Sequence, residues 1–384
     1  MSTSSGFLKF NSRPTQLYVT ADEDEFDTLF LSYLQEEGFK ATYLPYRGGG
    51  RAYFNELKHL ADDLEIGESY GIIAFASAAT DCLEFHIKPQ PKLAALIAYY
   101  PTEIPKPNTK YPVHLKVLCH IAGSQCFAPA FPSYTYQGTL PGFAEFDLEE
   151  YDKIAASLSW TRSLTTIRKA FQVELDKGLQ SAKDAHVSQI CSRHDLAGAL
   201  GTMALDCFVN NVPTMTGGVG KEQLLKFYKD YFISKGPPSL TVKLISRTLG
   251  VDRVVDEMIV SFKHTHDIPW ILPSVAPTGK QVHIAMVSVV SVRGGKLVSE
   301  STYWDQASVL VQVGLLNPSL VPENFKKQGL KRLPVYEAET AAKVLDEDSH
   351  PSNGLLADWG KPRAENGLPA RPKQAADGGH AKGS

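Results

Sequence analysis

Residues 70–85 have the frame of a turn that presents a catalytic nucleophile, but they lack the nucleophile. A short apolar run that ends at Phe75 leads into a cluster of small residues, and 81–85 reads as a helix start. A tight strand–turn–helix of this kind can expose a serine or cysteine at its apex for attack on an ester carbonyl. Here the apex is Ala76, whose methyl group has no nucleophilic atom, and Ser77 lies one residue beyond it. We expect Ser77 to point elsewhere and to fill space in the turn.

A second set of residues has types that suit proton transfer. In a strand over 253–264, alternate side chains share one face, and that face carries Val254, Asp256, Met258, Val260, Phe262 and His264. In a strand over 296–306, Tyr303 and Asp305 share a face. Desolvation raises the pKa of a carboxyl group, which can then act as a general acid or base near neutral pH. Asp305 is therefore a candidate acid/base residue if its strand face is desolvated, with His264 and Tyr303 as candidate partners; the alternative is that Asp305 caps the following turn.

Neighbouring residues complete the predicted site. His266 lies two residues from His264, so the two share a face in an extended strand and either can carry a proton. With His283 they make an H-x-H pattern plus a third histidine, which is a weak metal signature, and we expect no metal site. Trp270 opens a long apolar loop that either closes over a substrate or packs against the first half. The predicted substrate-binding residues are Asn211, Met258, Phe262, His266, Trp270 and Trp304.

Two regions of different texture must position these residues. Residues 15–150 alternate short β-branched or aromatic runs with helical stretches, which predicts βαβ units and a mostly parallel sheet. The expected strands are Gln16–Thr20, 41–45, Tyr70–Phe75, Leu93–Tyr99 and 115–121, and the expected helices are 25–37, 52–64 and one or two over 147–175.

From about residue 183, helices precede a run of long strands, which predicts an α+β domain with a curved antiparallel sheet around helices. The expected helices are 197–205 and 221–232, and the expected strands are 239–249, 253–264, 281–292 and 296–306. We place the first domain at 1–175 and the second at 183–330. The segment 345–384 is rich in Pro, Gly, Ala and charge, and we expect a disordered tail.

Composition excludes several classes of function. The chain has 384 residues, 43% hydrophobic and 21% charged, with a net charge of −3 and no basic block, so nucleic acid is not an expected partner. No apolar run is long enough to span a membrane, and the N-terminus lacks the pattern of a signal peptide. Five scattered cysteines without a C-x-x-C motif indicate reduced thiols and no cysteine-based zinc site. We expect a cytoplasmic protein.

The first half resembles the dienelactone-hydrolase branch of the α/β-hydrolases. The matching pieces are the strand–turn–helix at Ala76, the Ala98-Tyr99-Tyr100-Pro101 strand end, and the segments 117–125 and 134–143. In that family a cysteine nucleophile, an acid and a histidine make the triad, and the resemblance places them on Ala76, Gln125 and Pro141. None of these side chains can do its part of the reaction. The resemblance implies a degenerate hydrolase that serves as a structural platform.

The second half resembles the SnoaL-like polyketide cyclases, which have the nuclear-transport-factor-2-like cone fold. The matching pieces are Phe208-Val209-Asn210-Asn211-Val212-Pro213, the Thr216-Gly217-Gly218 turn, the strand end Tyr303-Trp304-Asp305, and Gln312-Val313-Gly314. The resemblance implies an apolar cavity on the concave face of the sheet and an acid/base aspartate on the last strand, here Asp305. The fusion of the two halves looks like a family of two-domain fungal proteins.

The leading hypothesis is an enzyme that needs no cofactor: a cyclase, isomerase or lyase that moves protons on a polyketide-like or aromatic carbonyl compound. The second is a non-catalytic binding or scaffold protein that uses the same cavity, and the third is an ester or lactone hydrolase. Two ionisable residues that converge inside the cone would favour the first over the second, whereas a Ser–His pair in the first half would favour the third. We also expect a homodimer, because 309–313 offers apolar surface.

Overall fold

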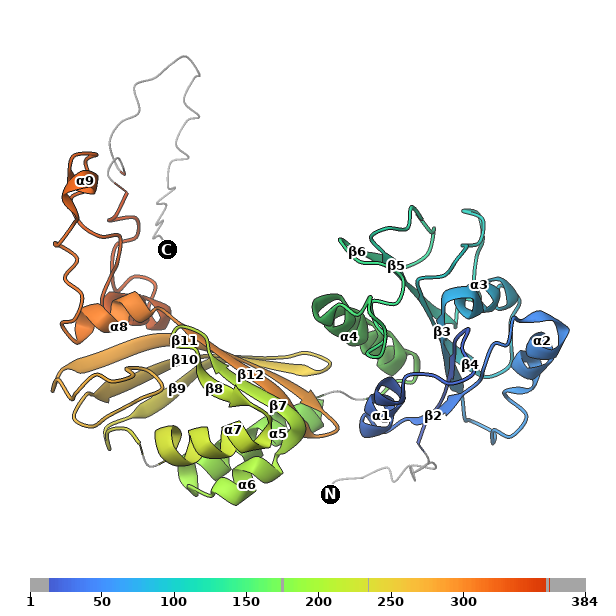
Figure 1. Cartoon of the computed structure of the whole chain (residues 1–384), viewed down its shortest axis with the longest axis horizontal. Helices are drawn as coiled ribbons and strands as arrows, with labels where there is room; N and C mark the ends of the chain where they lie inside the picture. Colours follow the sequence, from blue (N-terminus) through green and yellow to red (C-terminus); the bar gives the residue numbers. More distant parts are fainter. Residues whose placement is uncertain (1–13, 174–175, 234, 357–358, 360–384) are drawn as a thin grey trace, which may run out of the picture.

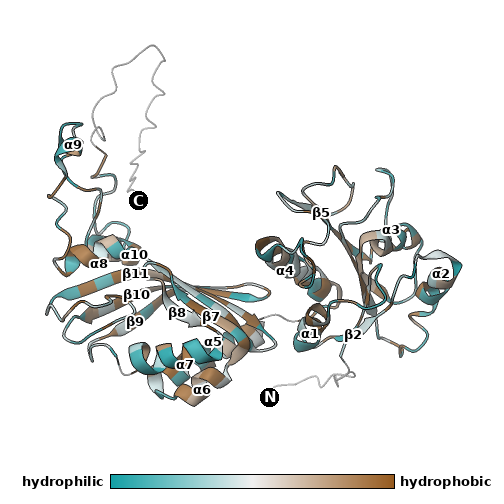
Figure 2. Ribbon diagram, in the orientation of Figure 1, coloured by the Kyte–Doolittle hydropathy of each residue, from teal (hydrophilic) through white to brown (hydrophobic). Residues whose placement is uncertain are grey.

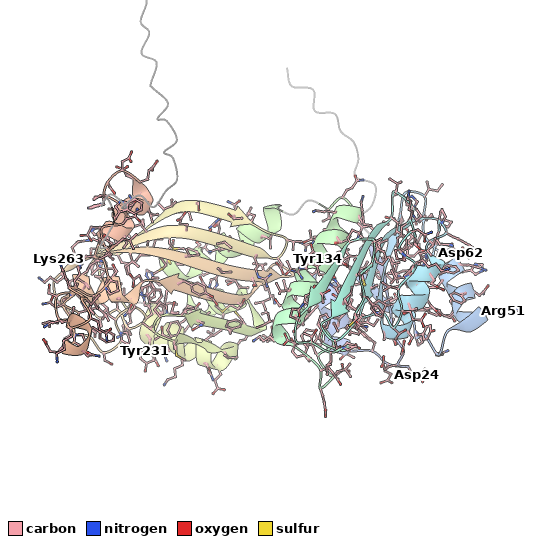
Figure 3. The ribbon with its side chains drawn as sticks, turned by 90° about the horizontal axis from the view of Figure 1, so that it is seen from above. Asp24, Arg51, Asp62, Tyr134, Tyr231 and Lys263 are labelled. Carbon is pink, nitrogen blue, oxygen red and sulfur yellow. The ribbon has the colours of Figure 1, made fainter. Side chains whose placement is uncertain are left out.

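Two six-stranded sheets organise the chain. The structure is a computed structural model that describes residues 14–173, 176–233, 235–356 and 359. One sheet uses residues 16–136 and the other uses residues 203–304 (Figure 1). Arg51 and Lys263 lie at opposite ends of the elongated molecule (Figure 3). Each half therefore builds its core on its own sheet.

The first sheet is parallel throughout, with strand order β2-β1-β3-β4-β5-β6. Its strands are β1 (Gln16–Thr20), β2 (Lys40–Tyr43), β3 (Tyr70–Phe75), β4 (Leu93–Tyr99), β5 (Lys116–Ala122) and β6 (Ser133–Tyr136). The central strands are buried on both faces, as expected of a parallel sheet that helices cover on both sides. The predicted parallel sheet is confirmed.

Helices cover both faces of this sheet. They are α1 (Thr28–Glu36), α2 (Gly50–His59), α3 (Ala76–Phe85) and α4 (Lys153–Ala170). Phe30 of α1 and Leu164 of α4 share one apolar core, whereas Leu57 of α2 and Leu83 of α3 share another on the opposite face. The chain passes from β1 outward to β2 and returns to place β3 on the other side of β1, so the strand order reverses there. Ligands of open α/β sheets bind at the carboxyl end of such a reversal.

The second sheet is antiparallel except for one parallel pair, β7 with β12, and its order is β8-β7-β12-β11-β10-β9. Its strands are β7 (Met203–Asn211), β8 (Thr216–Val219), β9 (Thr241–Leu249), β10 (Arg253–Lys263), β11 (Gln281–Arg293) and β12 (Lys296–Trp304). The four long strands predicted from the sequence are confirmed. The strands carry both hydrophilic and hydrophobic residues (Figure 2), and along β11 buried residues alternate with less buried ones, which is typical of a sheet with one face toward a core.

Helices lie along one face of the second sheet (Figure 1). They are α5 (Asp176–Val187), α6 (Leu196–Gly201) and α7 (Gly220–Phe227), with π-helical turns at Ser188–Ser192 and Tyr228–Phe232. Three further helices follow β12: α8 (Gln306–Gln312), α9 (Glu323–Lys326) and α10 (Glu339–Leu345). Helix α5 crosses β9 to β12 and faces the apolar core of this half. None of the described helices is long and apolar enough to cross a membrane.

Three strands were not predicted from the sequence: β6, β7 and β8. The expected helix 197–205 ends at Gly201, and β7 begins two residues later. The glycines that we took for a turn belong to β8, because Gly217 comes so close to β7 that a Cβ there would lie 2.0 Å from the carbonyl oxygen of Val209. The described part of the expected tail is hydrogen-bonded to α10. Lys343 Nζ of α10 donates to the carbonyls of Glu347 and His350 at 2.5 and 2.7 Å. Residues 360–384 lie outside the described residues.

The two halves touch through polar contacts at the start of β10 and the end of β11. Arg168 of α4 donates to the carbonyl oxygen of Val251 at 2.7 Å. Thr161 of α4 donates to Asp252 at 2.6 Å. Arg293 at the end of β11 pairs with Glu36 of α1 at 2.5 Å. These contacts turn the outer face of the second sheet toward α1 and α4.

Candidate functional site

The turn between β3 and α3 has a strained backbone at Ala76, the position predicted as the apex of a nucleophile elbow. Ala76 has φ +48°, a conformation that non-glycine residues rarely adopt and that marks functional turns. The backbone N–H groups that follow it would face a developing oxyanion in an active hydrolase. Here Asp22, just after β1, accepts from Ala78 N at 3.1 Å and from Ser77 N at 3.4 Å. The chain's own carboxylate therefore occupies the place where an oxyanion would bind.

The other two predicted triad positions have structural contacts. Gln125 accepts from Ala122 N at 3.0 Å and donates to the carbonyl of Pro101 at 2.8 Å, so it joins two loops. Pro141 is exposed. Neither side chain has a group that takes or gives a proton near neutral pH.

A serine–histidine pair does exist in the first half, but in the core. His120 binds Ser163 Oγ through Nε2 at 2.8 Å and Tyr136 through Nδ1 at 2.7 Å. His120 has no exposed surface, and burial, with Arg162 nearby, lowers its pKa to about 3. No carboxylate contacts His120 in the described part of the chain. The pair closes a buried hydrogen-bond network and does not form a triad.

The prediction that Asp305 lies on the cavity-facing side of the last strand is wrong. Strand β12 ends at Trp304, and Asp305 is exposed. Its Oδ1 accepts from Ala307 N at 2.9 Å and from Ser308 N at 3.3 Å, so it is the N-cap of α8. The alternation of the strand does not extend to a residue whose side chain turns back to the first backbone N–H groups of a helix.

Tyr303 also does not face the interior of the second half. It is 47% exposed and lies on the outer face of β12, turned toward the first half. The opposite face of β12 carries Thr302 and Trp304, with 7% and 9% of their surface exposed, and faces the helices. The face chosen from the sequence was therefore the wrong one for this strand.

The face of β10 that was predicted to carry binding residues does face the apolar core. Val254, Val260 and Phe262 belong to the apolar core, and Met258 packs against it. Asn211 of β7 is buried and donates to Thr216 at 3.1 Å. These predicted binding residues line the helix-covered side of the sheet.

The predicted histidines do not come together. His264 is buried, and its Nδ1 accepts from Thr278 N at 3.3 Å, whereas His266 is exposed beside Thr265. The chain leaves β10 at Lys263, so the two histidines do not share a strand face. His283 lies on the outer face of β11 and contacts Ser261. No cluster suited to a metal ion is found among the described residues.

The loop that starts at Trp270 packs against the second half and contributes side chains to its apolar core. Trp270 is 8% exposed and contacts Phe232 and Trp304, with ring centroids 5.2 and 5.9 Å away. Its carbonyl accepts from Thr214 at 2.9 Å. The apolar surface of 309–313 is likewise used within the chain, because Val309, Val311 and Val313 are buried. This segment does not offer the dimer surface that we expected.

A buried polar cluster lies between α5 and the sheet instead. Lys183 of α5 pairs with Asp256 of β10 at 2.7 Å, and both residues are 3% exposed. Arg247 of β9 holds the same carboxylate through two nitrogens at 2.7 and 2.9 Å. Burial alone would raise the pKa of Asp256, but the hydrogen bonds from Arg247 and Lys183 outweigh burial and lower it.

The cluster continues to Glu300 of β12. Lys183 donates to Ser288 Oγ at 3.3 Å, and Ser288 donates to Glu300 Oε1 at 2.8 Å. Glu300 and Met258 keep accessible surface although they lie in mid-strand on the helix-covered face. Both side chains are therefore only partly buried, unlike Asp256 and Ser288 beside them.

His186 of α5 presents an unprotonated nitrogen to this cluster. The hydroxyl of Thr202 donates to the carbonyl of Ala199 at 2.6 Å, so His186 Nδ1–H donates to Thr202, 2.6 Å away. The other nitrogen, Nε2, then carries a lone pair, and this buried atom has no hydrogen-bond partner in the described part of the chain. Burial lowers the pKa of His186, and the charge of Glu300 acts in the opposite direction. His186 is thus a neutral base at physiological pH.

Tyr228 completes the set from the π-helical turn after α7. Its ring lies 6.2 Å from that of His186, edge to face, and it is 1% exposed. Burial and then the charge of Glu300 raise the pKa of Tyr228 well above its usual value, so its hydroxyl stays protonated. The cluster therefore holds a base, an O–H donor and a carboxylate.

Sequence reasoning missed Lys183, His186 and Glu300. Lys183 and His186 are three residues apart, so they lie on the same side of a helix. The segment 176–187 was not predicted to be helical, so this spacing went unnoticed. Glu300 alternates with Thr302 and Trp304, and the tryptophan marks that side of β12 as the buried one. This was the one signal in the sequence that pointed to Glu300.

No protein-family model and no curated protein matches this chain. Solved structures do resemble part of it. A hypothetical protein with a ketosteroid isomerase-like fold from Catenulispora acidiphila, solved with trimethylamine, is 18% identical and covers 36% of this chain and 95% of its own, with a TM-score of 0.29.

Two other solved structures have similar values. A candidate SnoaL-like polyketide cyclase from Jannaschia sp. CCS1 is 16% identical over 38% of this chain and 99% of its own, with a TM-score of 0.30. An NTF2-like protein from Burkholderia xenovorans is 14% identical over 36% of this chain and 97% of its own, with a TM-score of 0.28. The chain is similar to these proteins over a little more than a third of its length.

Proposed function

We propose that the second half is an acid/base enzyme of the isomerase, cyclase or lyase type, which removes a proton from carbon beside the carbonyl group of an aromatic or polyketide-like molecule. The base is His186 in place of Asp305. The observation that carries this proposal is the buried lone pair of His186 Nε2, which has no partner in the described chain and lies in the field of Glu300.

Each member of the cluster has a role in such a reaction. His186 Nε2 takes the proton from carbon, and the electron pair of that C–H bond moves toward the carbonyl oxygen. Tyr228 donates a hydrogen bond to the oxygen as negative charge develops there. Glu300 stabilises the imidazolium that forms, as a carboxylate does beside a catalytic histidine. His186 then returns the proton to another carbon; alternatively, the carbanion attacks a second carbonyl carbon in the same molecule, the π electron pair moves to that oxygen, and the oxygen takes the proton from His186.

The test measures proton abstraction without knowledge of the natural substrate. α-Tetralone and 1-indanone are aromatic ketones whose α-protons exchange slowly in water, and proton NMR in D2O follows the loss of their signals. We expect the native protein to accelerate exchange and His186→Asn to reduce that acceleration by about 10²-fold or more. Asparagine keeps the hydrogen bond to Thr202 and removes the basic nitrogen.

Glu300→Gln gives a separate signature. The variant keeps an acceptor for Ser288 but removes the charge that raises the pKa of His186. We expect the acidic limb of the pH–rate profile to move to lower pH and the plateau rate to fall roughly tenfold.

The control is His194→Asn, the same substitution at an exposed position of the same half. His194 has φ +51°, which asparagine tolerates well, so fold and exchange should not change. Exchange of both ketones at equal rates in the native protein and in His186→Asn would contradict the proposal.

A further inference from the structure

A groove of about 530 Å³ lies between the two halves, away from the cone interior. One wall comes from α1, α4 and the segment before α4, and the other from the outer face of β7, β11 and β12. Figure 3 shows the junction from above, with Tyr134 of the edge strand β6 on the side of the first half. This volume is in the range of small-molecule sites, which often form where two parts of a protein meet.

Aromatic rings occur on both walls, and most of them belong to the first half. On the first half, Tyr33 contacts Phe146 and Trp160 edge to face, with ring centroids 5.3 and 6.1 Å away. On the second half, Phe208 and Tyr303 line the opposite wall. Such walls offer ring faces and edges to a flat aromatic molecule.

Two of the three basic side chains in the groove are already neutralised. Arg293 pairs with Glu36 at 2.5 Å and with Asp206 at 3.2 Å, and it stacks on Tyr33. Arg253 pairs with Asp252 at 3.1 Å. One basic side chain of the groove is therefore left without an acidic partner in the described part of the chain.

That cation is Lys153, at the first turn of α4. Its Nζ lies 5.1 Å from the centre of the Phe208 ring, and it forms no ion pair in the described part of the chain. It is exposed and points to the aromatic wall of the second half. An ammonium group beside an aromatic wall is complementary to a ligand that is both aromatic and anionic.

We propose that this groove binds a small planar aromatic carboxylate, with its ring between the aromatic walls and its carboxylate at Lys153. The proposal does not rest on the acid/base reaction in the cone, because no residue is shared by the two sites. A ligand held here contacts both halves and stabilises their mutual arrangement.

The probe is 2-naphthoate, and its neutral analogue is 2-naphthamide. Isothermal titration calorimetry with the full chain should give saturable binding of naphthoate. Lys153→Met keeps the apolar stem and removes the charge, and we expect it to weaken naphthoate binding about fivefold with no effect on naphthamide. Phe208→Leu removes an aromatic face and should weaken both.

The matched control is Lys169→Met, since Lys169 is exposed on the same helix but does not line the groove. It should leave both affinities unchanged. The proposal is overturned if naphthoate does not bind at millimolar concentration, or if the two lysine variants weaken it equally. A dimer in light scattering would also overturn the proposal if Ile154→Asp disrupts the dimer while naphthoate leaves it intact. The groove would then hold a second copy of the chain.

Discussion

Two buried carboxyl groups, one in each half, differ in what surrounds them. Glu145 in the first half is 6% exposed and Asp256 in the second is 3% exposed. Burial raises the pKa of Glu145 to about 7; the hydrogen bond from Tyr100 lowers it less than burial raises it, and the acidic neighbours Glu23, Asp147 and Asp27 raise it further. Burial acts on Asp256 in the same direction, but Arg247 and Lys183 outweigh it and lower the pKa.

The difference shows that burial alone does not decide the charge of a group. An acid with cationic partners stays ionised in the core and becomes a fixed structural charge, whereas an acid with a hydroxyl partner becomes protonated near neutral pH. The first half should therefore lose stability through Glu145 as pH rises, and the second half should lose stability through Asp256 as pH falls.

The largest effect is expected at Asp256. Asp256→Asn leaves Lys183 and Arg247 buried beside a neutral amide, and removal of one partner from a buried ion pair costs about 3–5 kcal/mol. The folded-state pKa of Asp256 is lowered, so its contribution is present above its ordinary pKa and is lost as pH falls through the lowered value. Urea denaturation at pH 7 and at pH 3 should show a smaller difference between the native protein and the variant at the lower pH.

Asp184→Asn is the control for this comparison. Asp184 also pairs with Arg247, at 2.8 Å, but its side chain is 52% exposed. An exposed pair contributes about 1 kcal/mol or less. Equal losses in the two variants would mean that the cluster of Lys183 and Asp256 is not sealed from water.

A smaller effect of opposite sign is expected at Glu145. Its folded-state pKa is raised, so its contribution is present at low pH and is lost as pH rises through about 7. Between pH 5 and pH 8 the native protein should lose about 3 kcal/mol from this group, and Glu145→Gln should not. Denaturant titrations at the two pH values test this, with Glu149→Gln, an exposed carboxylate on the same segment, as the control.

Strand patterns carried most of the fold prediction. Apolar runs such as Tyr70–Phe75 and the alternation of 253–264 follow from burial on two faces or on one, and both are local properties of the sequence. The short strand β8 was missed because two of its four residues are glycine, and Gly217 there allows the close approach to β7. Its meaning depends on a neighbour that is distant in sequence.

The site was harder to predict than the fold. The absence of a nucleophile at Ala76 was visible in the sequence, but nothing local indicated that Asp22 would bind the backbone of α3. The cluster of Lys183, Asp256 and Glu300 joins one helix and two strands, so its members acquire their roles only when the elements pack. Alternation also failed at Asp305, because the strand ends one residue earlier.

The smallest effect is expected at Asp305, and it tests whether the cap or the reaction explains that residue. As N-cap of α8, Asp305 satisfies two backbone N–H groups, and loss of such a cap costs about 1 kcal/mol. Asp305→Ala should lower the free energy of unfolding by this amount, whereas Asp305→Asn should change it by a few tenths, because asparagine caps helices equally well. Neither variant should alter the exchange of α-tetralone, because the carboxylate lies in solvent. If Asp305→Asn stopped the exchange while stability stayed the same, the acid/base role would return to Asp305, and His186 would be left as a buried structural histidine.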